Sequence, residues 1–280
     1  MGHAAGRCGR HPAAVGTAAV TRRTFAGMAA AAGLSLGAAR RLNIGIGTYS
    51  YHGLSMEAMI VQLQALHVQE IEMSRGEFML LSHPSADIFR NARTLFDRAG
   101  IRCVSYYAAT IHDQQELDSA IRFAKLLGAG NITGDATGRP MLKSIDEKCT
   151  QAGLSFGIHN HFFKTKFAYE SPENVLAALA GLSKTMGATA DVGQFASCGY
   201  DTVDAVRKLG PYLKLVHLKD IAAAGAEDNV LIGQGIAKIP EVMQELHKLN
   251  FPGLVAIEYE KEGPVEEDLR KEVAFARNLA

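Results

Sequence analysis

Beyond residue 41, short apolar runs alternate along the chain with longer stretches in which apolar residues recur at helical spacing. Each short run predicts a buried strand, and each longer stretch predicts an amphipathic helix. The predicted strands are Leu42–Tyr49, Val68–Met73, Ile101–Tyr107, Asn131–Gly134, Leu154–His159, Thr189–Val192, Leu213–Leu218 and Leu254–Tyr259. The predicted helices are Met56–Leu66, Ala86–Ala99, Gln114–Leu127, Leu142–Ala152, Pro172–Leu182, Thr202–Leu209, Ile239–Leu249 and Val265–Leu279.

The residues that flank these stretches support the assignment. Gly100, Gly128 and Gly153 each follow a predicted helix, where glycine is the preferred C-terminal cap. Ser171-Pro172 supplies an N-cap and a first-turn proline to the fifth helix.

Eight strand-then-helix units in a row predict an α/β fold of the (β/α)8 (TIM) barrel type, as one domain over residues 42–280. The strands are apolar without strict alternation, which is typical of parallel strands covered by helices. An open doubly wound sheet is the alternative. That fold usually carries a G-x-G-x-x-G turn after its first strand, and Gly45–Ser50 lacks the full pattern.

Residues 1–41 have the layout of a signal peptide rather than of a folded segment. Arg22-Arg23 and Phe25 precede a weakly apolar run rich in Ala and Gly, which ends in small residues at Gly37-Ala38-Ala39. The arginine pair resembles the twin-arginine export signal, so we expect an exported, periplasmic or extracytoplasmic protein. The apolar run is too short for stable membrane insertion. A disordered Ala/Gly-rich tail is the other interpretation.

The composition of the chain favours a small molecule as its binding partner. The chain has 29 basic and 29 acidic residues, so it lacks the basic surface that binding to nucleic acid needs. Its four cysteines form no C-x-x-C pair; Cys8 lies in the leader, and we expect Cys103, Cys149 and Cys198 to be free thiols. A homo-oligomer is compatible with this composition.

Polar residues end several of the predicted strands, where the active sites of such barrels lie. Four consecutive strands end in His159, Asp191, His217 and Glu258, and strand two ends in Glu72. Taken singly, each has a simpler explanation, as a bonded core histidine, a helix cap or a solvated glutamate. Their convergence on neighbouring strands predicts a site for one divalent metal ion. Nitrogen and oxygen donors suit Mn, Zn, Co, Fe or Ni better than Mg.

The strand ends His159-Asn160-His161, Asp191-Val192-Gly193, His217-Leu218-Lys219-Asp220 and Glu258-Tyr259 resemble the sugar phosphate isomerase/epimerase family of xylose-isomerase-like TIM barrels. The resemblance implies that a Glu, an Asp, a His and a Glu on strands five to eight bind one metal. It also implies that the two Glu exchange a proton of the sugar. A glycine-rich loop follows strand seven in that family, matched here by Gly233-Gln234-Gly235.

One position departs from that pattern, because His159 replaces the strand-five Glu. An imidazole that binds the metal cannot also serve as a free base. His161 faces the same side of its strand, and an ordinary histidine pKa near neutrality would suit it to acid/base work with Glu258. Lys219 could stabilise oxyanion charge, or simply pair with its neighbour Asp220.

These residues predict metal-assisted proton transfer on a small carbohydrate: a sugar, a keto-sugar or a polyol. Glu72, Tyr107 and Asn160 are the candidate substrate-binding residues. Isomerisation, epimerisation and β-elimination from a 3-keto sugar by a lyase are all compatible with the residues. A non-catalytic carbohydrate-binding barrel is a further alternative, suggested by the missing strand-five Glu. An endonuclease would need more metal ligands and a basic groove, and neither is evident.

Overall fold

The computed structural model describes residues 41–74, 85–162 and 168–280, so the predicted leader lies outside the described residues. Eight parallel strands close into a barrel in the order β1-β10-β7-β6-β5-β4-β3-β2. These strands are β1 (Asn43–Gly47), β2 (Glu70–Met73), β3 (Arg102–Ile111), β4 (Asn131–Ala136), β5 (Ser155–His159), β6 (Met186–Asp191), β7 (Leu213–Leu218) and β10 (Leu254–Ile257). The predicted single-domain TIM barrel is therefore confirmed.

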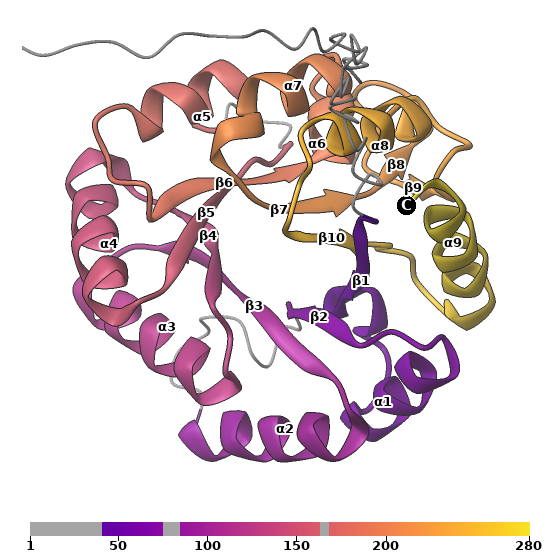
Figure 1. The fold of residues 1–280 in the computed structure, drawn as a ribbon, viewed down its shortest axis with the longest axis horizontal. Helices are drawn as coiled ribbons and strands as arrows, with labels where there is room; N and C mark the ends of the chain where they lie inside the picture. The colour runs from indigo at the N-terminus through magenta and orange to yellow at the C-terminus, as the bar shows by residue number, and fades with distance from the viewer. Residues whose placement is uncertain (1–40, 75–84, 163–167) are drawn as a thin grey trace, which may run out of the picture. The chain divides into compact units, whose positions relative to one another are not determined.

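Helices surround the strands on all sides, as Figure 1 shows. They are α1 (Met56–Ala65), α2 (Ala86–Ala99), α3 (Gln114–Leu127), α4 (Gly138–Ala152), α5 (Pro172–Leu179), α7 (Thr202–Leu209), α8 (Ile239–Lys248) and α9 (Glu266–Leu279). Gly100, Gly128 and Gly153 cap α2, α3 and α4 in the left-handed conformation, and Ser171 accepts a hydrogen bond from Asn174 N at the start of α5. The predicted helix ends are confirmed at these positions.

Five short elements were not expected from the sequence. The 3-10 turn η1 (Thr48–Tyr51) follows β1, and the 3-10 turn η2 (Gly210–Tyr212) precedes β7. A short helix, α6 (Val192–Ser197), follows β6 directly. The strands β8 (Asp220–Ile221) and β9 (Asn229–Val230) form a small antiparallel sheet outside the barrel. All of them except η2 come after the carboxyl ends of barrel strands, where they shape the rim of the barrel.

The interior of the barrel is partly polar. Ser105, Thr133 and Thr189 are fully buried, and their hydroxyls lie 3.0–3.1 Å apart in a chain that Asn131 extends by donating to Ser105. Leu215, Leu254 and Ala256 form a separate small apolar cluster in neighbouring strands. Most of the apolar core lies instead between the strands and the helices, so the barrel interior can hold the polar groups on which the site depends.

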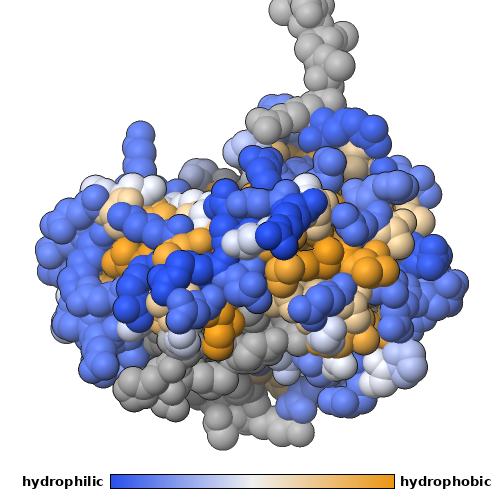
Figure 2. Space-filling view, turned by 90° about the horizontal axis from the view of Figure 1, so that it is seen from below, coloured by the Kyte–Doolittle hydropathy of each residue, from blue (hydrophilic) through white to orange (hydrophobic). Residues whose placement is uncertain are grey.

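The side of the molecule formed by α1 and α2 is mainly hydrophilic, with hydrophobic patches between the helices (Figure 2). Val61 on α1 and Ile88 on α2 are 60% and 40% exposed. Cys103, Cys149 and Cys198 are free, as predicted. Among the described residues, no helix has the length and apolar character that a membrane crossing requires.

Candidate metal centre

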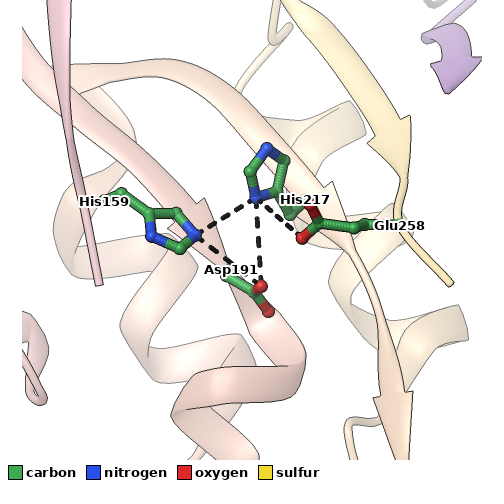
Figure 3. Close-up of side chains that lie close together, drawn as sticks. All are labelled: His159, Asp191, His217 and Glu258. Carbon is green, nitrogen blue, oxygen red and sulfur yellow. Dashed lines mark hydrogen bonds and ion pairs between the residues drawn. The ribbon is translucent and has the colours of Figure 1, made fainter. Parts of the chain in front are cut away.

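Four side chains from consecutive barrel strands meet at the carboxyl rim, as Figure 3 shows. They are the four predicted metal ligands: His159 from β5, Asp191 from β6, His217 from β7 and Glu258 directly after β10. All four are buried, and each offers a ligand atom within 4.8 Å of the others. The structure thus brings together a group that could hold one metal ion.

The separations between these atoms suit a small cation. His217 Nδ1 lies 3.2 Å from His159 Nε2 and 3.3 Å from Glu258 Oε2. Asp191 Oδ2 lies 3.8 Å from His159 Nε2 and 3.9 Å from His217 Nδ1. A tetrahedral ion bound at ~2.1 Å by each donor would separate the donors by ~3.4 Å. The four atoms therefore need only small shifts to hold such an ion.

The two carboxylate oxygens of Asp191 have different surroundings. Its Oδ1 accepts the backbone N–H of Gln194 and so caps the short helix α6. Its Oδ2 is buried and accepts no hydrogen bond from any described residue. Its partners at this oxygen are an ion pair with Lys219 Nζ at 3.3 Å and the more distant imidazoles, and a buried carboxylate oxygen without a hydrogen bond is costly. A metal ion at this position would satisfy it, which is the observation that best fits the residues to a cation.

Asn160 fixes the backbone that carries Asp191. Its side-chain amide donates to the Asp191 carbonyl at 2.9 Å, and its oxygen accepts the Asp191 N–H at 2.8 Å. Asn160 is 1% exposed. The sequence suggested substrate binding for Asn160, but both ends of its side chain are engaged by the neighbouring strand. In this structure Asn160 lies beside a candidate metal ligand rather than in contact with solvent.

Lys219 reaches the same group of acids. Its Nζ lies 3.2 Å from Glu258 Oε2, 3.3 Å from Asp191 Oδ2 and 2.8 Å from Glu260 Oε1. Burial alone would lower the pKa of Lys219, but the surrounding carboxylates outweigh it and raise the pKa well above its ordinary value. Burial likewise raises the pKa of Asp191, yet Lys219 and the two imidazoles hold it below its usual range. Lys219 is therefore a permanent cation beside the ligands.

Asp220, the alternative partner for Lys219, serves a different purpose. Its carboxylate accepts the backbone N–H groups of Ile221, Gly233, Gly235 and Ala237 at 2.9–3.0 Å. A side chain at Gly235 would overlap this carboxylate and the Ile221 carbonyl. Asp220 thus ties down the glycine-rich loop that the sequence identified after strand seven.

His161 lies beside the ligands but differs from the sequence expectation. Its ring centroid is 5.7 Å from that of His159, and its Nδ1 lies 2.6 Å from the Phe162 carbonyl. Burial and the adjacent His159 lower the pKa of His161 to about 4. This shift differs from the near-neutral pKa expected from the sequence, because that expectation took no account of burial. The ring is neutral at physiological pH.

Tyr107 and Glu72, the other two predicted substrate-binding residues, contact the ligand histidines. The Tyr107 hydroxyl lies 3.5 Å from His159 Nδ1, and the two rings meet edge to face. Glu72 is fully buried, with its Oε2 2.5 Å from His217 Nε2. Both residues thus lie behind the histidines, on the side away from the shared ligand atoms.

The sequence analysis missed Asp135, near the end of β4. The strand was predicted to end at Gly134, but it continues to Ala136. Asn131 and Thr133 bond to groups inside the barrel, and Asp135 follows two residues later on the same face. A bulge in β3, with Ala109 at φ 53°, places Thr110 opposite Asp135. Burial raises the pKa of Asp135, against a hydrogen bond from Thr110 and the proximity of His159. The strand-end rule used elsewhere would have found it had this strand been extended.

The fold and the site together define the class of protein: a parallel (β/α)8 barrel with two histidines and two carboxylates at its carboxyl rim. Residues 72–279 match the family model described as Xylose isomerase-like TIM barrel, and the chain belongs to this family. Comparison with curated proteins gives no match.

Solved structures with the same fold include sugar-converting enzymes. An uncharacterised protein from Parabacteroides distasonis is 25% identical, with a TM-score of 0.64 over 85% of this chain and 99% of that one. A D-psicose 3-epimerase solved in the presence of D-fructose is 15% identical, with a TM-score of 0.68 over 85% and 99%. An L-ribulose 3-epimerase is 14% identical, with a TM-score of 0.64 over 85% and 92%. At these identities the two epimerases show the shared fold alone.

Proposed function

We propose that this protein is a metal-dependent enzyme of the sugar isomerase and epimerase type, which transfers a proton at a carbon atom of a sugar, keto-sugar or polyol. The observation that carries the proposal is the buried group of four donors around Asp191 Oδ2, an oxygen without a hydrogen bond among the described residues. The family and the epimerases that share the fold support it.

The residues that would hold the metal are His159, Asp191, His217 and Glu258. Two imidazoles and two carboxylates suit Mn, Zn, Co, Fe or Ni better than Mg. A divalent cation bound there supplies Lewis acidity, which makes a C–H bond next to a carbonyl group easier to ionise. The remaining chemistry belongs to the side chains around it.

Glu258 and His161 are the proposed acid and base. Glu258 is 7% exposed at the rim, close to Lys219 and His217. Since His161 Nδ1 lies against the Phe162 carbonyl, a proton exchanged at this ring would use Nε2. The neutral imidazole can accept a proton in the reaction, although burial lowers the pKa of His161 to about 4 and makes it a weak base.

Lys219 and Asp135 complete the proposed substrate site. The Lys219 ammonium would stabilise negative charge that develops on a substrate oxygen as the proton leaves carbon. Asp135 lies on β4, three strands around the barrel from β7, and its carboxyl group, which is 7% exposed, can accept hydrogen bonds from sugar hydroxyls. This arrangement favours a small polyhydroxylated substrate.

Deuterium exchange tests the proposal. Metal-loaded protein is incubated in heavy water with a panel of sugars and keto-sugars, and the products are analysed by NMR and mass spectrometry. We expect deuterium at a carbon next to a carbonyl group, and its loss in Glu258→Gln. A released unsaturated product would indicate elimination from a 3-keto sugar. Sugar binding without exchange would replace the proposed enzyme with a carbohydrate-binding barrel.

The proposal extends to location: the protein is exported by the twin-arginine route. Arg22-Arg23 and the weakly apolar run that follows support this, although both lie outside the described residues. Export of a folded protein would allow the metal to be loaded before export. A substrate outside the cytoplasm is less suited to be phosphorylated, because phosphorylated sugars are retained inside the cell.

A further inference from the structure

We infer that Glu72 is a positioning residue of the metal centre, which holds His217 so that Nδ1 rather than Nε2 faces the metal. This inference rests on the proposed metal-binding function. It concerns a residue on β2, at the other side of the barrel from the strand that carries His217. The two residues are 145 positions apart in the sequence.

The two ring nitrogens of His217 have different surroundings. Nδ1 faces the other ligands, at 3.2 Å from His159 Nε2 and 3.3 Å from Glu258 Oε2. Nε2 faces away from them and lies 2.5 Å from Glu72 Oε2. A carboxylate can only accept here, so Nε2 carries the hydrogen and donates it. In the neutral ring, which is the form that binds a metal, the lone pair is then on Nδ1, aimed at the group of ligands.

Glu72 is itself held in place from two directions. Its Oε1 accepts a hydrogen bond from Ser105 Oγ at 2.8 Å, and Ser105 belongs to the buried chain of hydroxyls inside the barrel. The pairing of β2 with β3 shifts register between Ile71 and Glu72, which sets the direction of this side chain. Both Glu72 and His217 are fully buried, so neither contact competes with water.

Charge provides a second, independent argument. Asp191, Glu258 and Glu72 are three buried carboxylates in one connected group, and Lys219 is its buried ammonium. Together with a divalent cation, these buried charges balance; Glu260, the further partner of Lys219, is set apart by its 34% exposed side chain. Without Glu72, the metal-bound group would carry an excess positive charge in a buried place, which is unfavourable. Glu72 thus supplies the third negative charge while His159 contributes a neutral ligand.

Tyr107 occupies the corresponding position behind His159, but its contact is weaker. The distance from its hydroxyl to His159 Nδ1 is 3.5 Å, and the group is uncharged. We therefore assign the larger effect on the metal to Glu72. Partners of this kind fix the orientation of ligand histidines and raise their basicity.

Cobalt binding tests the assignment with a readout independent of activity. The metal-free full-length protein, Glu72→Gln and the control Glu272→Gln are titrated with Co²⁺ and followed by visible absorption. Glu72→Gln keeps the shape and can still accept from His217, but it removes the charge. We expect its Co²⁺ dissociation constant to rise about 10- to 100-fold, with an altered absorption band. Glu272 is a buried glutamate on α9 without a described contact to the ligands, so its variant should stay within about 2-fold of the wild type.

Each outcome bears on a different claim. Wild-type affinity and spectrum in Glu72→Gln would overturn the role of Glu72 and leave the metal centre intact. Absence of Co²⁺ binding in the wild type would overturn the metal centre as well. If Glu72→Gln does not fold, ¹⁵N NMR of the His217 ring in the Zn²⁺-loaded wild type decides: a hydrogen on Nε2 with a metal-bound Nδ1 is expected, and the reverse arrangement would refute the inference.

Discussion

At the scale of single residues, Gly193 determines whether Lys219 can reach the ligands. A Cβ atom at Gly193 would lie 2.5–2.9 Å from three carbon atoms of the Lys219 side chain. These atoms are near the backbone of Lys219, so they cannot move away easily. Packing therefore explains the glycine of Asp191-Val192-Gly193. It leaves room for the Lys219 side chain, whose ammonium lies beside Asp191 and Glu258.

We predict that Gly193→Ala displaces Lys219 and lowers the free energy of unfolding by about 1–3 kcal/mol, with a loss of activity. Thermal unfolding and the deuterium-exchange assay measure the two effects. Gly130→Ala is the matched control, because a Cβ there meets no atom within 4 Å. Equal stability and activity in the two variants would show that Lys219 tolerates the added methyl group.

The environment of Glu272 leads to a prediction about how stability depends on pH. Burial raises its pKa to about 8, although Oε1 accepts the Ile232 N–H at 3.2 Å. The folded protein therefore keeps a proton that the unfolded chain has lost between about pH 4.5 and pH 8. Since the folded state binds more protons in this window, the free energy of unfolding falls as pH rises through it.

Glu272→Gln removes this titration. We expect the variant to resemble the wild type near pH 5 and to be more stable above pH 8, by on the order of 1–3 kcal/mol. Denaturant unfolding at both pH values gives the difference. Glu267→Gln, on the exposed side of the same helix, should show no such pH-dependent gain. A stability difference that is constant with pH would contradict the assignment.

At the scale of elements, the hydrophobic pattern located all eight barrel strands because each is buried on both faces and bounded by polar residues. It placed the end of β4 too early, since Gly134 and Asp135 interrupt the apolar run. It also missed α6 and the small sheet of β8 and β9. These elements are short, and hydrogen bonds of Asp191 and Asp220 define them rather than periodicity.

The candidate ligands followed from the strand-end rule, because parallel strands bring their carboxyl ends to one rim. The contact between Glu72 and His217 could not follow from the same rule. It depends on closure of the barrel, on a register shift beside Ile71 and on the choice of side-chain rotamers. The sequence placed Glu72 at the rim but gave no information on which residue it meets across the barrel.

The loop after β7 yields a prediction at this scale. Asp220 is 1% exposed and accepts four backbone N–H groups, three of them from residues 233–237. Asp220→Asn would turn a donor toward some of these N–H groups. We expect the free energy of unfolding to fall by about 1–3 kcal/mol, with faster hydrogen exchange over residues 231–237. Asp97→Asn, which affects only a surface pair with Arg93, is the control. Unchanged exchange in Asp220→Asn would contradict the anchoring role.

At the scale of the whole molecule, export by the predicted leader can be tested separately from metal binding by the barrel. We expect Arg22→Lys with Arg23→Lys to abolish export, because the twin-arginine route depends on the arginine pair. Fractionation of cells that express the full-length chain gives the measurement. Arg40→Lys with Arg41→Lys is the control, a second arginine pair downstream of the apolar run. Continued export of the first variant would refute the proposed route.

The proposed metal centre connects the fold to the proposed reaction, and the metal content of the protein can be measured directly. Elemental analysis of the protein purified without an affinity tag should give close to one divalent metal ion per chain. Asp191→Ala and His217→Ala should lose most of it, since each removes a ligand atom from the buried group. Full metal content in both variants, or no metal in the wild type after incubation with Mn²⁺, Zn²⁺ or Co²⁺, would contradict the proposed centre.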